Sequence, residues 1–184
     1  MSREIDAVFL DRDGTICEER GPVRTWEELR VFPYTVPVLR RIRSLGLRIV
    51  VVSNQAAIAR GLATYAEVDS VNERLMAHLG NQGAKILDSL FCPHHPEGTV
   101  PEFTCKCWCR KPNPGMLLQA AERFGIRLEQ SIMIGDNISD LQAGLAAGCA
   151  TSILLRTGHG HSFSQAYDGP VLDSLCDLAD WLEH

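Results

Sequence analysis

The stretch Ala7-Val8-Phe9-Leu10-Asp11-Arg12-Asp13-Gly14-Thr15 decides the expected fold. The apolar run at its start predicts a buried strand. The two carboxylates that follow at once lie where open α/β sheets bind their ligands, at the carboxyl ends of the strands. Two acids this close repel each other unless a cation or a shared proton offsets their charge. The stretch therefore indicates a hard metal ion and chemistry at an anionic centre.

Two simpler interpretations of the same residues compete with this one. Asp and Gly both favour turns, so Asp-x-Asp-Gly is often only a polar turn. The run could also begin a calcium loop of the EF-hand type. Thr15-Ile16-Cys17 follows, however, without the later acidic ligands that such a loop requires.

Length, composition and charge narrow the class of protein. A chain of 184 residues suits a single domain, expected over 1–184, with a substantial core. The net charge is −5 and no basic block occurs, which argues against nucleic-acid or membrane-surface partners. Residues 1–6 lack the apolar core of a signal peptide, and no apolar run reaches transmembrane length. We expect a cytoplasmic monomer.

Apolar runs and helix-like segments alternate along the chain. The expected strands cover residues 7–10, 48–52, 86–91, 131–134, 151–155 and 171–172. The expected helices cover residues 35–45, 64–79, 113–125 and 141–147, with a last helix capped by Ser174. This alternation predicts an α/β fold, a three-layer Rossmann-like parallel sheet with helices on both faces.

Small polar residues follow several of these strands. Ser53-Asn54-Gln55 comes after the second strand, and Gly135-Asp136-Asn137 comes after the fourth. Because parallel strands end at one edge of the sheet, we expect these residues to lie near Asp11. The segment 18–32, between the first strand and the first helix, is either a small flap over this edge or a plain loop.

Cysteine and histidine residues cluster within residues 92–109. Four of them form a C-x-H…C-x-C set that matches a closed, structural zinc site, namely Cys92, His94, Cys107 and Cys109. His95 and Cys105 could compete as ligands. The alternative is a group of free or redox-active thiols. A metal here would offset the entropy of an 18-residue loop insertion.

Arg110-Lys111 follows this loop directly and precedes an expected helix. A basic pair is usually a solvated surface feature. Here it is tethered to the expected metal loop and delivered toward the strand ends. Positive charge at that edge is what a phosphate-binding site needs.

Four motifs together resemble the haloacid dehalogenase superfamily of phosphatases. They are Asp11-Arg12-Asp13-Gly14-Thr15, Ser53-Asn54-Gln55, Arg110-Lys111-Pro112 and Gly135-Asp136. The zinc set is similar to the branch that holds heptose-bisphosphate and histidinol-phosphate phosphatases. Two further short sequence segments resemble those of that branch, namely Ala59-Arg60-Gly61 and Cys92-Pro93-His94-His95-Pro96. Within the fold, the resemblance implies a minimal cap and a zinc-loop insertion.

The resemblance implies a Mg²⁺-dependent phosphatase that acts on a small phosphorylated sugar. Asp11 would attack phosphorus and Asp13 would move the proton. Mg²⁺ would bind Asp11, the main-chain carbonyl of Asp13, and Asp136. Ser53, the backbone N–H of Asn54, and Lys111 would stabilise the phosphoryl oxygens. The expected substrate contacts are Arg12, Asn54, Gln55, Arg110 and Asn137.

One residue departs from the family pattern, and one has two possible roles. Asn137 stands where related sequences often carry Lys, which removes a positive charge near the substrate. Asp140 orients Lys111 or a metal-bound water, or else it acts at the start of a helix.

Histidinol phosphate or another small ester is an alternative substrate. A binding protein on the same fold is disfavoured because Asp11 and Asp13 are both present.

Overall fold

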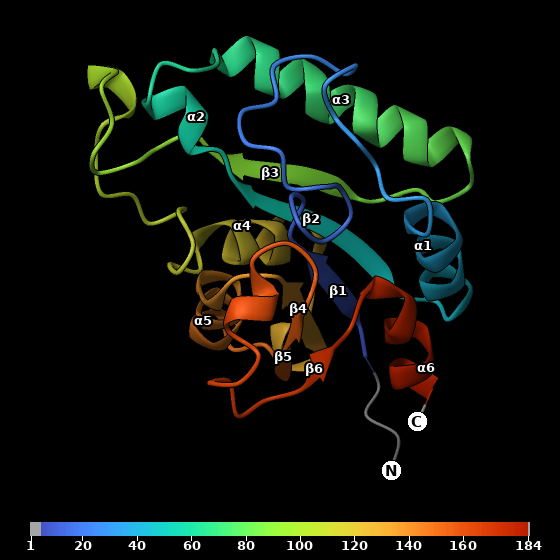
Figure 1. Cartoon of the computed structure of the whole chain (residues 1–184). Coiled ribbons are helices and arrows are strands. Elements are labelled where there is room, and N and C mark those ends of the chain that lie inside the picture. The colour runs from blue at the N-terminus through green and yellow to red at the C-terminus, as the bar shows by residue number, and fades with distance from the viewer. Residues whose placement is uncertain (1–4, 184) are drawn as a thin grey trace.

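A computed structural model describes residues 5–183 of the chain (Figure 1). Residues 1–4, part of the stretch expected to lack a signal peptide, lie outside this range. The strands, all parallel, are β1 (Ala7–Leu10), β2 (Arg48–Asn54), β3 (Asp88–Cys92), β4 (Ser131–Gly135), β5 (Thr151–Leu155) and β6 (Val171–Leu172). They form one six-stranded sheet in the order β3-β2-β1-β4-β5-β6.

Helices cover both faces of this sheet. They are α1 (Thr35–Ser44), α2 (Ala56–Ala59), α3 (Tyr65–Asn81), α4 (Gly115–Phe124), α5 (Ile138–Ala147) and α6 (Leu178–Glu183). Figure 1 shows α1, α3 and α6 on one side and α4 and α5 on the other. The predicted three-layer α/β fold is confirmed.

The side chains of β1 divide between two hydrophobic cores, because successive residues of a strand point to opposite faces. Val8 and Leu10 pack in the core under α1 and α3, whereas Ala7 and Phe9 pack in the core under α4 and α5. All four are fully buried. Burial on both faces explains why this strand is an uninterrupted apolar run.

The strand order places a crevice beside the end of β1. From β1 the chain moves outward through β2 and β3, then returns to β4 on the other side of β1. Leu10 pairs with Ile134, and the Asp11 N–H donates to the carbonyl of Ile134 at 2.9 Å, so the two strands end at the same level. Ligands bind at such a switch point in open α/β sheets. Asp11 and Asp136 therefore begin the two segments that flank this crevice.

Several predicted boundaries differ from the structure. β3 runs from Asp88 to Cys92, two residues later than its predicted start. The predicted cap of α4 is wrong, because Pro114 is its N-cap residue and the Asn113 side chain donates to the carbonyl of Cys107 instead. α5 begins at Ile138 rather than Leu141 because Asn137 caps it. α2 was not predicted, since four residues are too few for a periodic pattern.

The segment 18–32, expected to be either a small flap or a plain loop, packs on the molecule as a loop. Val23 and Leu29 are buried in the core under α1, so most of the segment packs on the molecule. The Glu18 N–H donates to the carbonyl of Arg30 at 2.8 Å, which closes the segment on itself. Glu19 alone among its described residues reaches the cavity described below. The segment therefore contributes one rim residue instead of a lid.

Short 3₁₀ turns complete the described chain, at Pro101–Phe103, Leu128–Gln130, Gly160–Ser162 and Leu175–Asp177. The last turn leads into α6 and is capped by Ser174, as predicted. Between residues 5 and 183, none of the helices has the length and apolar character that a membrane span requires.

Replacing a helical glycine by alanine is expected to change stability in opposite directions at two positions. A Cβ at Gly144 of α5 would lie 2.5 Å from the Met133 Cβ, so we expect Gly144→Ala to lower the free energy of unfolding by about 1–3 kcal/mol. A Cβ at Gly80 of α3 would meet nothing within 4 Å, so Gly80→Ala should raise it by about 0.5–1 kcal/mol. Urea unfolding of both variants measures these changes. Equal effects would contradict the packing of α5 on β4.

Candidate active site

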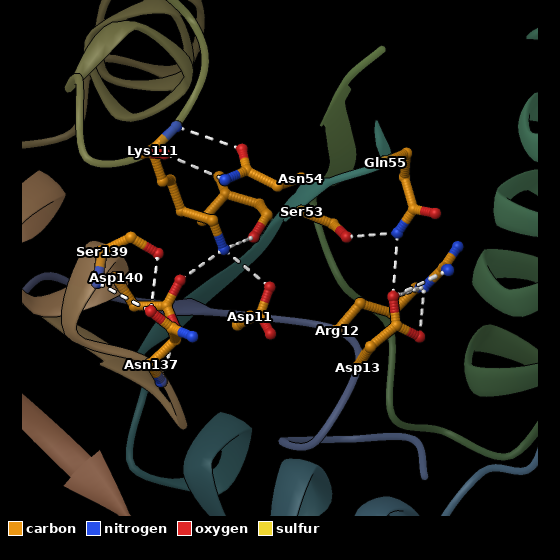
Figure 2. A network of polar contacts seen from close by, with 11 residues as sticks. Asp11, Arg12, Asp13, Ser53, Asn54, Gln55, Lys111, Asn137, Ser139 and Asp140 are labelled. Atoms are coloured by element: carbon orange, nitrogen blue, oxygen red, sulfur yellow. Dashed lines mark hydrogen bonds and ion pairs between the residues drawn. The ribbon is translucent and has the colours of Figure 1, made fainter. Parts of the chain in front are cut away.

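A buried lysine joins the elements around the crevice. The Lys111 Nζ lies 2.6 Å from Asp11 Oδ1 and 2.6 Å from Asp140 Oδ1, and it donates to the carbonyl of Val52 at 2.8 Å (Figure 2). These partners come from the end of β1, from α5 and from β2. Lys111 itself stands before α4, and only 3% of it is exposed. One side chain thus ties four separate segments together at the sheet edge.

The Asn54 side chain holds the backbone of Lys111. Its Nδ2 donates to the Lys111 carbonyl at 2.9 Å, and its Oδ1 accepts from the Lys111 N–H at 3.0 Å. We expected Asn54 to contact substrate through its backbone N–H, and no observation tests that role. The side chain positions Lys111 from the end of β2.

Burial governs the electrostatics of this cluster. Burial raises the pKa of Asp11 well above its usual range, although Lys111 acts in the opposite direction. Burial alone would lower the pKa of Lys111, but the carboxylates of Asp11 and Asp140 outweigh it and raise that pKa. Burial also raises the pKa of Asp136 to about 6, against the effect of its bond with the His159 N–H. Acidic groups outnumber the single lysine here, which favours an additional cation.

Three carboxylates could share a metal ion. Oxygens of Asp11, Asp136 and Asp140 all lie within 4.8 Å of one another, and the three residues are buried. Such oxygen donors suit a hard divalent cation. The structure thus brings the predicted ligands Asp11 and Asp136 together. It adds Asp140, and the carboxylate of Asp13 lies outside this group.

Two glycines allow the backbone to pass close to Asp136. A Cβ at Gly14 would lie 2.2 Å from Asp136 Oδ2, and a Cβ at Gly158 would lie 2.0 Å from the same atom. Both glycines have positive φ, which L side chains rarely adopt. Any larger residue at either position would displace the Asp136 carboxylate.

A separate polar network holds Asp13 (Figure 2). The Arg12 Nη2 lies 2.8 Å from Asp13 Oδ2, and the Gln55 Nε2 donates to that oxygen at 2.8 Å. Gln55 also donates to Ser53 Oγ at 2.6 Å, and Arg12 Nη1 donates to Asn72 Oδ1 at 3.0 Å. The acid that follows Asp11 by two residues is therefore oriented by its neighbours on the side away from Lys111.

This network involves two residues that were expected to contact substrate. Arg12 and Gln55 are 0% and 5% exposed, and neither lines the cavity. Their predicted contact with substrate stays a prediction. Donors of both side chains are directed at Asp13, whose partly buried carboxylate requires hydrogen-bonding partners. In this structure, both side chains orient Asp13.

Asn137 and Asp140 form the start of α5. The Asn137 side chain accepts from the Ser139 N–H at 3.1 Å, and Asp140 Oδ2 accepts from the Asn137 N–H at 3.0 Å. Since Asp140 Oδ1 contacts Lys111, both interpretations of Asp140 hold at once. Asn137 also lines the cavity, so its predicted substrate contact stays a prediction.

A cavity of about 590 Å³ opens above these groups. Its lining residues are Asp11, Asp13, Glu19, Ser53, Asn54, Ala56, Arg60, Arg110, Lys111, Pro112, Asp136, Asn137, Ser139, Asp140 and His159. The sequence-based reasoning assigned no role to Glu19, Arg60, Ser139 or His159. Arg60 had one available signal, the Ala59-Arg60-Gly61 segment that follows the Ser53 motif after a few residues and resembles related phosphatases.

The predicted zinc ligands lie together beside this cavity. Ligand atoms within 4.8 Å of one another are offered by Cys92, His94, Cys107 and Cys109. The Cys109 Sγ lies 2.7 Å from that of Cys107 and 3.1 Å from that of Cys92, and the His94 Nδ1 lies 3.7 Å from Cys92 Sγ. Three thiols and one imidazole match the ligand set of a closed tetrahedral zinc site.

The two competing ligands lie outside this group. Cys105 is exposed, and the ring of His95 faces Arg60, with 3.4 Å between His95 Nε2 and Arg60 Nη2. The C-x-H…C-x-C spacing therefore selects the four residues that the fold brings together.

Comparison with known proteins identifies the family. Residues 18–148 match the family model of haloacid dehalogenase-like hydrolases. The chain belongs to this family. The membership predicted from the four motifs is confirmed, and the chain is a hydrolase by family.

Relatives resemble the chain over nearly all of its length. It is 40% identical to D-glycero-beta-D-manno-heptose-1,7-bisphosphate 7-phosphatase of Yersinia pestis over 97% of this chain and 95% of the relative. It is 39% identical to D-glycero-alpha-D-manno-heptose-1,7-bisphosphate 7-phosphatase of Photorhabdus laumondii over 85% of each chain. The crystal structure of D,D-heptose 1,7-bisphosphate phosphatase from B. bronchiseptica, complexed with magnesium and phosphate, superimposes with a TM-score of 0.84. That structure is 28% identical and covers 97% of this chain and 98% of its own.

The close approach at Gly158 predicts the effect of a single methyl group. Gly158→Ala should push aside the Asp136 carboxylate and lower kcat for p-nitrophenyl phosphate by about a hundredfold or more. The matched control is Gly125→Ala, which has the same positive-φ strain but no atom within 4 Å of its Cβ. Steady-state kinetics and thermal unfolding of both variants make the measurement. Equal kcat values would show that Asp136 is not required.

Proposed function

We propose that the protein is a Mg²⁺-dependent phosphatase that removes the 7-phosphate of D-glycero-D-manno-heptose 1,7-bisphosphate. The observation that carries the proposal is the buried set of Asp11, Asp136 and Asp140 around Lys111, inside a cavity shared with the end of the Cys/His loop. The names of the full-length relatives supply the substrate. Both anomers occur among those names, so the proposal leaves the anomer open.

Asp11 and Asp136, with the main-chain carbonyl of Asp13, would hold Mg²⁺. The residues fit such an ion, because the three buried carboxylates of Asp11, Asp136 and Asp140 face the single charge of Lys111. Bound Mg²⁺ offsets the repulsion between the Asp11 carboxylate and the incoming phosphate. The B. bronchiseptica relative was crystallised with magnesium and phosphate, which supports this assignment.

Asp11 would attack the phosphorus in line with the departing sugar oxygen. The new bond joins a carboxylate oxygen to phosphorus, the bond to the sugar oxygen breaks, and Asp13 gives that oxygen its proton. A water then attacks phosphorus, Asp13 takes a proton from it, and the Asp11 carboxylate is released. Hydrogen bonds from Arg12 and Gln55 would hold the Asp13 carboxylate in position for both proton transfers.

Lys111 and Ser53 would bind the phosphoryl oxygens, together with the backbone N–H of Asn54. Lys111 stays protonated beside two carboxylates, so its charge is available where negative charge develops. Ser53 lines the same cavity and has its Oγ held by Gln55. Arg110 would contact the substrate beyond the reacting phosphate, and Asn137 lies at the same cavity wall.

A structural Zn²⁺ would join Cys92, His94, Cys107 and Cys109. The ion would hold in place the loop that leads into Arg110 and Lys111. Uncrosslinked cysteines of this kind suit a reducing compartment, so we propose a cytoplasmic protein. We further propose a single-domain monomer that serves the synthesis of ADP- or GDP-heptose for lipopolysaccharide.

The substrate assignment predicts an order of kcat/KM values. We expect both anomers of heptose 1,7-bisphosphate to be hydrolysed faster than fructose 1,6-bisphosphate and histidinol phosphate, by at least about tenfold for the better anomer. Release of inorganic phosphate under steady-state conditions gives the values. A preference for histidinol phosphate would replace the proposed substrate with the alternative one.

Two variants control that experiment. Asp11→Asn should lose turnover on every substrate in the panel while its unfolding midpoint stays within a few degrees, because the change is nearly isosteric. Asp69→Asn, an exposed position on α3, should keep full activity. Retained turnover in Asp11→Asn would remove Asp11 as the nucleophile.

A further inference from the structure

Helix α3 directs one polar side chain toward the active site. Asn72 lies among the buried apolar residues of that helix and is 3% exposed. Its Oδ1 accepts a hydrogen bond from Arg12 Nη1 at 3.0 Å, whereas its Nδ2 finds no acceptor within residues 5–183. A buried amide that is only half satisfied costs free energy. The contact with Arg12 is therefore the interaction that accounts for a polar residue at this position.

The Arg12 guanidinium is buried between two acceptors. Arg12 is 0% exposed, and its Nε and Nη2 donate to the Asp13 carboxylate at 3.1 and 2.8 Å. Nη1, at the other end of the group, has Asn72 Oδ1 as its acceptor among the described residues. Because the guanidinium is rigid and planar, a bond that fixes Nη1 also fixes the direction in which Nε and Nη2 point.

Asp13 is the end of this chain of contacts that faces the cavity (Figure 2). Its side chain is 15% exposed, and Gln55 Nε2 donates to one of its oxygens at 2.8 Å. That single bond leaves the carboxylate free to rotate about it, whereas Arg12 Nε contacts both oxygens. The orientation of the Asp13 carboxylate therefore depends on Arg12, and through Arg12 on Asn72.

We propose that Asn72 is a positioning residue of the reaction, which sets, through Arg12, the direction from which Asp13 gives its proton to the leaving oxygen. The proton is transferred as the bond between phosphorus and that oxygen breaks, and the transfer requires a separation of about 2.6–3.2 Å between the two oxygens. Asn72 does not line the cavity, so it acts without touching a substrate there. The inference rests on the acid role of Asp13 in the proposed function, but not on the identity of the sugar.

Two substrates of nearly equal size test this role. p-Nitrophenyl phosphate releases a stabilised phenolate, which leaves without a proton. p-Nitrobenzyl phosphate is one methylene longer and releases an alkoxide, which must be protonated. The value of kcat/KM covers the steps up to cleavage of the P–O bond, so the later role of Asp13 as a base does not enter. The ratio of the two kcat/KM values is also independent of the fraction of the sample that is folded.

Asn72→Leu removes the acceptor and nearly keeps the size of the side chain. We expect it to lower kcat/KM for p-nitrobenzyl phosphate by about tenfold, and to change the value for p-nitrophenyl phosphate by less than about twofold. Asn72→Asp keeps the acceptor oxygen and should restore the wild-type ratio. Val71→Ala, at the neighbouring buried position of α3, is the matched control for packing. It should lower the unfolding midpoint and leave the ratio unchanged.

Asp13→Asn separates this inference from the proposed function, because it removes the acid itself. It should show a larger selective loss on the nitrobenzyl ester, of about a hundredfold or more. Equal losses on both esters in Asp13→Asn would remove the acid role of Asp13, and the inference with it. A selective loss in Asp13→Asn with an unchanged ratio in Asn72→Leu would overturn the inference alone, as would the same selective loss in Val71→Ala. If Asn72→Leu does not fold, Asn72→Ala takes its place in the comparison.

Discussion

The contact of the Lys111 Nζ with Asp11 and Asp140 is the interaction on which the rest of the site depends. Burying these three charges costs free energy that their mutual attraction offsets only when the geometry is good. The contacts at 2.6 Å and the added bond to the Val52 carbonyl meet that condition. Removing the lysine would leave two buried carboxylates unpaired, beside a third at Asp136. The site therefore requires a cation at this point before substrate or metal binds.

The loop that precedes Lys111 serves to position this residue. Lys111 follows an excursion that begins at the end of β3, and it belongs to none of the strands. Asn54 clamps that backbone from β2, and the Cys/His cluster closes the loop immediately upstream. A metal ion held by this cluster would reduce the entropy lost when the loop is ordered. The loop thus places the positive charge of Lys111 at the sheet edge. It also places the neighbouring Arg110 at the rim of the cavity.

The sequence alone predicted the elements whose causes are local or periodic. The apolar run 7–10, the Thr64 capping box and the spacing of Cys107 and Cys109 each carry their own signal, and each agrees with the structure. The placement of Asp11 and Asp136 at one edge followed from parallel strands ending together. Arg12, Gln55 and Asn137 were harder to assign, because motif position does not fix where a side chain points. Arg12 and Gln55 turn to Asp13, and Asn137 caps α5 with its own side chain.

The central claim is that Asp11 carries the phosphoryl group between the sugar and water. The steric course at phosphorus tests it most directly, with a phosphorothioate substrate made chiral by one heavy oxygen isotope and hydrolysed in water enriched in the other. Two successive in-line displacements each invert the configuration, so overall retention is expected in the released thiophosphate. Overall inversion, the result of a single direct attack by water, would contradict it.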